Sequence, residues 1–325
     1  MRRLSYSLGS LLSIEEVLEC SRKLNEIKPE VEWIPETWGM ENFSMLGLAS
    51  KENTFSKIGS SIINIYSRSP SLIAMGASTI DTISNGRLIL GLGTSSVPIV
   101  ENFHGNSFDT HVQRMKEYVE IIRLALQGEK INYSGKIFTL KDFSLLVNPT
   151  RKQIPIYLAA INHKMLELTW NIADGVIFYL RPKEEMRQTI GKMQNKKKID
   201  TSLQIITCID NDSEKARNKA KKTLSFYIAV GKIYREFLES NGYSDVAQQI
   251  YKEYEKTGLD QLDILVPNSM LDDLCIAGTP EEGIKKLQGF RDVGIDLPII
   301  QFNPIGNTKE SFELLTKTFS GESNE

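Results

Sequence analysis

The sequence has few residues that carry out chemistry on their own. Three cysteines and three histidines occur in 325 residues. Cys20, Cys208 and Cys275 lie far apart and form no CxxC pair, which argues against a disulfide framework and favours a reducing, cytoplasmic compartment. No HxH, HExxH or paired-carboxylate spacing occurs either, so we expect no metal site.

An excess of one charge is also missing. The 39 basic and 41 acidic residues leave a formal net charge of -2, which gives no electrostatic reason to expect a nucleic-acid partner. The first apolar stretch is interrupted by serine, glycine and acidic residues, so we expect neither a signal peptide nor a membrane anchor. The expected partner is therefore a small-molecule substrate.

What the sequence does contain is a regular alternation of apolar strands and amphipathic helices. A helix from Ile14 to Ile27 is predicted, with Ser13 and Glu16 as its capping box. Eight segments read as buried strands, each followed by a helix: LSYSL, VEWIP, KIGSSIINI, RLILGLG, IPIYLAA, DGVIFY, LQIITCI and LPIIQF. Eight such units predict an α/β fold, a (β/α)8 TIM barrel. We expect one domain over residues 1–325, with a helical insertion around 213–275.

In such barrels the chemistry lies where the strands end, and there this chain offers mostly small, neutral residues. The fragment NGRLILGLGTSS ends one strand with Gly91 and Gly93, followed by Thr94, Ser95 and Ser96. The glycines indicate either tight packing at the rim or room for a flat ring, to which the next residues present amide and hydroxyl donors. A scarcity of acids and imidazoles at the mouth favours an enzyme whose cofactor supplies the chemistry.

Three longer segments resemble the bacterial-luciferase-like superfamily. They are YSRSPSLIAMGASTIDTISNGRLILGLGTSS, RMKEYVEIIRLALQGEKINYSGKIFTL and PIYLAAINHKMLELTWNIADGVIF. The superfamily has a (β/α)8 fold and contains enzymes that use flavin mononucleotide (FMN) with oxygen, and others that use the deazaflavin coenzyme F420. The segment GSSIINIYSRSP resembles methylenetetrahydromethanopterin reductases of the F420-dependent branch.

The resemblance implies roles for individual residues. A non-proline cis peptide behind the cofactor ring is expected at Ser61-Ile62, and Glu36 stands where relatives have an acid beside the ring. Glu36 is the expected catalytic residue, as proton donor or stabiliser of an iminium ion, or else it forms a structural salt bridge. The expected cofactor-binding residues are Ser61, Ile62, Asn64, Gly93, Thr94, Ser95, Ser96, Ala160, Ile161, Asn162 and Tyr179.

Two positions depart from the family pattern. Thr37 replaces a histidine found beside the ring in many relatives, and Ser96 replaces an acid found in several F420-dependent members. The resemblance implies an F420-dependent oxidoreductase that transfers a hydride to or from an electrophilic carbon. The most specific version of this expectation has a methylene-pterin as the substrate. The alternatives are an FMN-dependent monooxygenase and a non-catalytic flavin-binding member. A homodimer or homotetramer is also implied.

Asp81 and Arg87 flank the Asn-Gly turn at the start of RLILGLG, away from the mouth. We interpret them as a structural ion pair.

Overall fold

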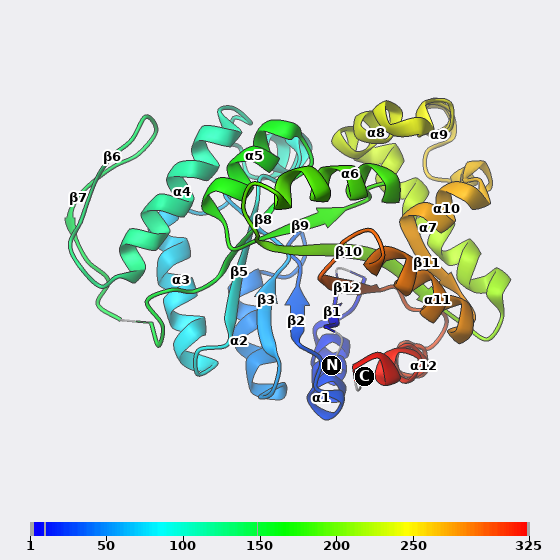
Figure 1. Ribbon diagram of the computed structural model, residues 1–325, viewed down its shortest axis with the longest axis horizontal. Helices are drawn as coiled ribbons and strands as arrows, with labels where there is room; N and C mark the ends of the chain where they lie inside the picture. Colours follow the sequence, from blue (N-terminus) through cyan, green and yellow to red (C-terminus); the bar gives the residue numbers. More distant parts are fainter. Residues whose placement is uncertain (1–2, 10, 148, 324–325) are drawn as a thin grey trace. The chain divides into compact units, whose positions relative to one another are not determined.

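Figure 1 shows the computed structural model of the chain, which describes residues 3–9, 11–147 and 149–323. The chain divides into two compact units. One comprises residues 12–177 and 197–200, and the other comprises the N-terminal strand together with residues 178–196 and 201 onward.

The first unit is built on a parallel sheet in the order β2-β3-β5-β8-β9, with the short β4 paired to β5. The strand bounds are β2 Val31–Ile34, β3 Lys57–Ser60, β4 Ile63–Asn64, β5 Leu88–Gly93, β8 Ile156–Ala159 and β9 Gly175–Tyr179. β5 is buried at every position, which fits a strand covered on both faces. An antiparallel hairpin, β6 Ile131–Ser134 and β7 Thr139–Phe143, forms a separate two-stranded sheet.

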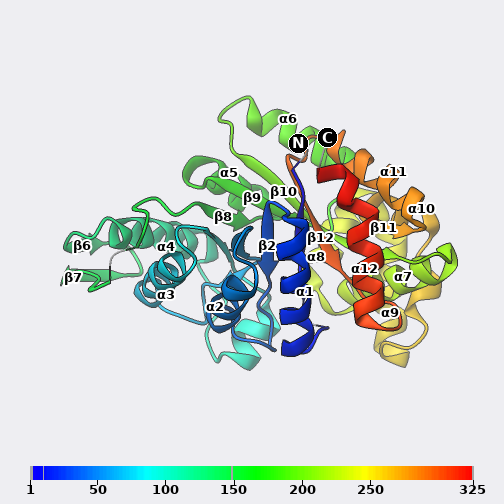
Figure 2. The ribbon, with the colours of Figure 1, turned by 90° about the horizontal axis from the view of Figure 1, so that it is seen from below.

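Helices cover the outside of this sheet, and each packs on the next along the chain (Figure 2). They are α1 Ile14–Ile27, α2 Asn42–Glu52, α3 Pro70–Ile83, α4 His111–Leu126 and α5 His163–Ile172. The predicted capping box of α1 is confirmed, because Ser13 Oγ accepts from the Glu16 N–H and Glu16 Oε2 accepts from the Ser13 N–H. Pro70 begins α3, where its missing N–H does no harm.

The second unit has a parallel sheet in the order β11-β10-β12-β1. Its strands are β1 Ser5–Ser7, β10 Asp200–Ile209, β11 Cys275–Gly278 and β12 Leu297–Phe302. Its helices include α6 Lys183–Gln194, α7 Ser213–Val230, α8 Lys232–Leu238, α9 Ser244–Thr257, α10 Asn268–Leu274, α11 Pro280–Arg291 and α12 Thr308–Phe319.

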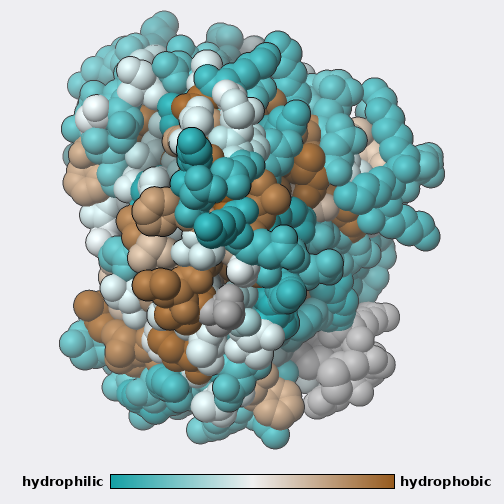
Figure 3. Space-filling view, turned by 90° about the vertical axis from the view of Figure 1, so that its left-hand side faces the viewer, coloured by the Kyte–Doolittle hydropathy of each residue, from teal (hydrophilic) through white to brown (hydrophobic). Residues whose placement is uncertain are grey.

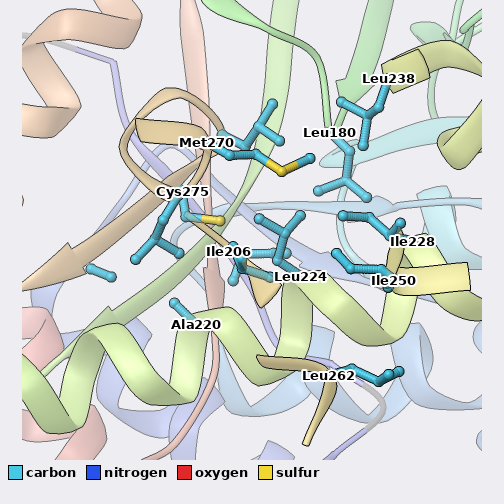
Figure 4. Close-up of a cluster of buried hydrophobic side chains, with 14 of the residues drawn as sticks. Leu180, Ile206, Ala220, Leu224, Ile228, Leu238, Ile250, Leu262, Met270 and Cys275 are labelled. Atoms are coloured by element: carbon cyan, nitrogen blue, oxygen red, sulfur yellow. The ribbon is translucent and has the colours of Figure 1, made fainter. Parts of the chain in front are cut away.

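A buried apolar cluster holds α7 to α10 against the sheet of the second unit. Leu224 and Ile228 of α7 meet Met270 of α10 and Cys275 of β11 in this cluster, together with Leu180 after β9 (Figure 4). Full burial of each such side chain contributes roughly 1.5–3 kcal/mol. These helices stand between β10 and β11, in the stretch where we expect an insertion.

The fold class predicted from the sequence is confirmed. In the described part of the chain, β1, β2, β3, β5, β8, β9, β10 and β12 run parallel and each is followed by a helix, which is the (β/α)8 TIM-barrel fold. The sequence reading missed β11, whose four residues pair with β10. The expectation of a single domain stays a prediction.

Some apolar side chains remain at the surface of the first unit. Leu48, Leu72 and Met75, on α2 and α3, are each about half exposed. Figure 3 shows hydrophobic side chains reaching the surface on the face that carries the β6-β7 hairpin. The implied homodimer or homotetramer stays a prediction. No described helix has both the length and the apolar character to cross a membrane.

The predicted ion pair between Asp81 and Arg87 is wrong. Asp81 is fully buried and pairs with Arg151, whose Nη2 lies 2.5 Å from Asp81 Oδ1. Arg87 donates instead to backbone carbonyls, including those of Asn53 at 3.0 Å and Ser50 at 2.9 Å. Both residues are structural, but each stabilises a different loop.

Glu32 is a buried acid on β2, facing α1 and α2. It accepts hydrogen bonds from Ser21 Oγ at 2.5 Å and from Asn53 Nδ2 at 2.8 Å. Burial raises the pKa of Glu32 to about 7, although both hydrogen bonds and the charge of Arg87 act in the opposite direction.

Glu32 should therefore make the stability of the protein depend on pH. A raised pKa in the folded state stabilises the fold below the ordinary value of 4.5, and this contribution is lost as the pH rises to about 7. The free energy of unfolding should fall by on the order of 3 kcal/mol over this range. Urea unfolding of Glu32→Gln should lack that fall, whereas the exposed control Glu19→Gln should keep it. If the free energy of unfolding of Glu32→Gln fell with pH as steeply as that of the unmodified protein, this pH dependence could not be assigned to Glu32.

Candidate cofactor site

The segment from Ser61 to Asn64 interrupts what the sequence reads as one strand. β3 ends at Ser60, the peptide bond between Ser61 and Ile62 is cis, and β4 follows at Ile63–Asn64. The cis bond lies where the family resemblance places it, so this expectation is confirmed. β4 then pairs with Leu92 and Gly93 at the end of β5.

Two buried polar atoms in this segment have no hydrogen-bond partner in the described part of the chain. They are Ser61 Oγ and Asn64 Nδ2. The other side-chain atom of Asn64, Oδ1, accepts from the Tyr66 N–H at 2.9 Å, which fixes the direction of the amide. A buried polar group without a partner costs roughly 1–3 kcal/mol, so such groups call for an explanation. Donors left open in this way fit the polar edge of a planar cofactor.

The glycines of β5 are explained by strand packing. A Cβ atom at Gly91 would collide with the carbonyl oxygen of Ser60, and one at Gly93 would lie 2.5 Å from Ile62 Cδ1. The structure thus favours the first of the two interpretations, tight contact between neighbouring strands. The role of Gly93 in cofactor binding stays a prediction.

Thr94, Ser95 and Ser96 follow β5 and are partly exposed. Their hydroxyl groups make no hydrogen bond to any described residue, which leaves them available to a ligand. Ser95 has a left-handed backbone, with φ 59°, and the Ser96 carbonyl accepts from the Val100 N–H at 3.0 Å. That bond leads into a π-helical turn, Pro98–Phe103, a conformation often found at functional sites.

Glu36 forms a salt bridge, which is one of the two roles expected for it from the sequence. Arg68 Nη1 donates to Glu36 Oε2 at 2.8 Å and Nη2 donates to Glu36 Oε1 at 2.5 Å. The two side chains are only 10% and 11% exposed. The backbone N–H groups of Asn42 and Asn64 also donate to this carboxylate, at 3.2 and 3.4 Å. A proton on Glu36 would displace one of these donors.

Arg68 lies in the segment GSSIINIYSRSP, and the sequence alone did not predict its pairing with Glu36. Its Nη2 also donates to Glu41, the N-cap residue of α2. Burial lowers the pKa of the Arg68 guanidinium, but hydrogen bonds and charges from Glu36 and Glu41 outweigh burial and leave that pKa raised. No local spacing could reveal this, because Glu36 and Arg68 are 32 positions apart.

Ala160, Ile161 and Asn162 lead into the N-terminus of α5. Ala160 is buried, while Asn162 is the exposed N-cap residue and makes no side-chain cap. Within the described residues no side chain therefore caps the first N–H groups of α5, as an anion site at a helix N-terminus requires. Their role in holding a phosphate stays a prediction.

Tyr179 ends β9 and belongs to the other compact unit. Its ring meets those of Tyr227 and Tyr234 edge-on, with centroids 5.1 and 5.5 Å away. Burial raises the pKa of Tyr179 well above its usual value. Its expected contact with a cofactor stays a prediction.

The fold and these strand ends define a class of protein, a TIM-barrel enzyme with neutral hydrogen-bonding groups at the ends of its strands. Among the described residues, no three His, Cys, Asp or Glu side chains gather as a metal site requires. The chain belongs to the luciferase-like monooxygenase family, whose profile matches residues 3–297. The resemblance seen in the sequence is thereby confirmed.

Relatives within the family include F420-dependent enzymes. A 5,10-methylenetetrahydromethanopterin reductase of Archaeoglobus fulgidus is 29% identical over 225 residues, 66% of this chain and 67% of that protein. The structure of the coenzyme F420-dependent tetrahydromethanopterin reductase of Methanopyrus kandleri matches with a TM-score of 0.86 and 22% identity over 98% of both chains. An F420-dependent secondary alcohol dehydrogenase, solved with an F420-acetone adduct, matches with a TM-score of 0.79 and 16% identity over 98% of both chains.

Removal of Arg68 should strongly destabilise the first unit. Arg68→Met leaves Glu36 as a buried carboxylate without its cation, which should lower the free energy of unfolding by about 3–5 kcal/mol. Glu36→Gln should be milder, because Arg68 keeps Glu41. As a control, Arg22→Met removes an exposed ion pair with Glu52 and should change stability by about 1 kcal/mol or less. Equal urea midpoints for Arg68→Met and Arg22→Met would contradict this account.

Proposed function

We propose that this protein is a coenzyme F420-dependent oxidoreductase that transfers a hydride between the deazaflavin ring and an electrophilic carbon. We propose a methylene-pterin as the substrate. The observation that carries the proposal is the pair of buried, unpartnered donors Ser61 Oγ and Asn64 Nδ2, in the segment that resembles methylenetetrahydromethanopterin reductases. The 29% identity with the Archaeoglobus reductase supports the same cofactor and substrate class.

Each part of the first unit's site has a task in this proposal. Ser61, Ile62 and Asn64 back the ring, and Ser61 Oγ and Asn64 Nδ2 donate hydrogen bonds to its polar edge. Hydroxyl groups of Thr94, Ser95 and Ser96 complete the polar contacts beside Gly93. The N–H groups at the start of α5, after Ala160, Ile161 and Asn162, hold the phosphate of the cofactor.

Bound F420 supplies the hydride, and the protein supplies position and charge. Both oxygens of Glu36 accept hydrogen bonds from Arg68. Glu36 therefore acts in this proposal as a negative charge near residues 61–64, here called the ring segment, and not as a proton donor. The Asn64 N–H donates to Glu36 and holds this charge beside the backbone on which the ring is proposed to lie. A fixed carboxylate of this kind stabilises a positively charged carbon–nitrogen centre, such as an iminium ion.

A pair of adjacent serines offers a sharp test of the ring segment. Ser61→Ala removes a hydroxyl without a partner, so stability should stay the same or rise, whereas the affinity for F420 should fall about three- to tenfold. Ser60→Ala removes a hydroxyl that bonds both the N–H and the carbonyl of Gly91, so it should lower stability. Fluorescence titration with F420 and urea unfolding of both variants measure the two effects. Unchanged F420 affinity in Ser61→Ala would contradict the assigned contact.

The cofactor itself is tested by anaerobic titration of the protein with reduced F420 and, separately, with reduced FMN. We expect saturable binding of F420 and oxidation of bound reduced F420 on addition of 5,10-methylenetetrahydromethanopterin. Tight binding of FMN alone would instead favour a monooxygenase of the same family. No binding of either by folded protein would favour a non-catalytic member.

A further inference from the structure

A second polar pocket lies between the start of α3 and α4, and the proposed function does not use it. Its volume is about 290 Å³, and it lies wholly within the first unit. Its lining includes Ser67, Arg68, Ser69, Asn106, Arg114 and Tyr118. We propose that this pocket binds a small oxyanion, a phosphate or carboxylate group, with Arg114 as its main ligand.

The two arginines of the pocket differ in how their charge is balanced. Arg68 is saturated by Glu36, Glu41 and Ser67 Oγ. Arg114 is only 22% exposed, yet the single carboxylate within 4 Å of its guanidinium in the described chain is Asp109, at 3.8 Å. Asp109 is 62% exposed, so water screens this pair. Arg114 is therefore a largely desolvated cation with a weak counter-charge, which favours binding of an anion.

The guanidinium of Arg114 is also held in place. It lies over the ring of Tyr66 at 4.8 Å and that of Phe138, on the hairpin, at 5.7 Å. Its Nε is buried and has no hydrogen-bond partner in the described chain. A guanidinium fixed in this way loses little freedom on binding and presents paired N–H groups that match the oxygens of a phosphate or carboxylate.

The neighbouring polar groups allow an anion to approach. Ser69 Oγ accepts from the Leu72 N–H at 3.2 Å, which leaves its own proton free to donate. Tyr118 donates its proton to the Arg68 carbonyl at 2.7 Å, and Tyr66 donates to the Asp109 carbonyl at 2.6 Å. Both hydroxyl oxygens therefore accept from Arg114, and Ser69 is the donor left beside it. The acids Glu36, Glu41 and Asp109 are not part of the pocket lining. The described lining of the pocket therefore carries one weakly balanced positive charge, that of Arg114, and no carboxylate.

Inorganic phosphate is the probe for the test, with chloride at equal ionic strength as the reference. Calorimetric titration of the full chain should show saturable binding, and Arg114→Gln should weaken it at least tenfold. Lys116→Gln removes the same charge from the same helix at a more exposed position, 48% exposed, and should bind phosphate as the unmodified protein does. Arg114→Lys keeps the charge but loses the paired N–H groups, so its affinity should be intermediate.

Titration with acetate, and competition of phosphate with F420 or with the substrate, identify the source of the anion. Phosphate that competes with F420 in the unmodified chain but not in Arg114→Gln would assign the pocket to the tail of the coenzyme. Phosphate that instead raises the KM of the substrate would assign it to an acidic group of the substrate, and competition with neither would indicate a free anion. Each of these supports an oxyanion site. The proposal is overturned if neither phosphate nor acetate binds saturably, or if Arg114→Lys and folded Arg114→Gln bind as tightly as the unmodified chain. The titrations need no coenzyme, so their outcome is independent of the proposed function.

Discussion

The close contact between Ser60 and Gly91 fixes the part of the candidate site that follows β3. Ser60 Oγ donates to the Gly91 carbonyl and accepts from the Gly91 N–H, both at 2.8 Å. These two bonds replace the regular ladder at the point where β3 ends. Because a side chain at Gly91 would meet the Ser60 carbonyl, only glycine permits this approach. The backbone that follows, from Ser61 to Asn64, is therefore held against β5 before any ligand is considered.

Glu36 fixes the same segment from the other side. Its carboxylate receives the Asn64 N–H after β4, the Asn42 N–H at the start of α2 and two N–H groups of Arg68. One side chain thus joins the stretch from Glu36 to Asn42 to the segment 64–68, whose Asn64 and Arg68 lie 28 and 32 positions further along the chain. Full saturation of this carboxylate contrasts with the open donors of Ser61 and Asn64 a few residues away. The frame of the site is complete within the protein, and its open hydrogen-bonding groups include the side chains of Ser61 and Asn64 and the hydroxyl groups of Thr94, Ser95 and Ser96.

The fold could be predicted because its determinants are local. The capping box of Ser13 and Glu16, the proline that begins α3 and the apolar runs that became eight strands can each be recognised within a few residues. Resemblance to a family placed the cis peptide correctly. The partners of charged residues could not be predicted, because they depend on packing between distant segments. Asp81 pairs with Arg151, 70 positions away, and Arg87 donates to backbone carbonyls instead of to Asp81. β11 was not predicted because its sequence, CIAG, has a single β-branched residue and ends in glycine, which gives little indication of a strand.

The same reasoning explains why glycines and serines give different information about the site. A glycine in a strand is equally suited to close packing and to ligand approach, so the pattern of Gly91 and Gly93 left both interpretations open until the neighbouring strand was in view. Most buried hydroxyls and amides have a partner, and Ser60 Oγ has one in Gly91 whereas Ser61 Oγ has none among the described residues. Ser60 is satisfied by the fold, whereas Ser61 is not. Function in this chain is therefore better sought in hydrogen-bonding groups that folding leaves open than in residue types that suggest catalysis.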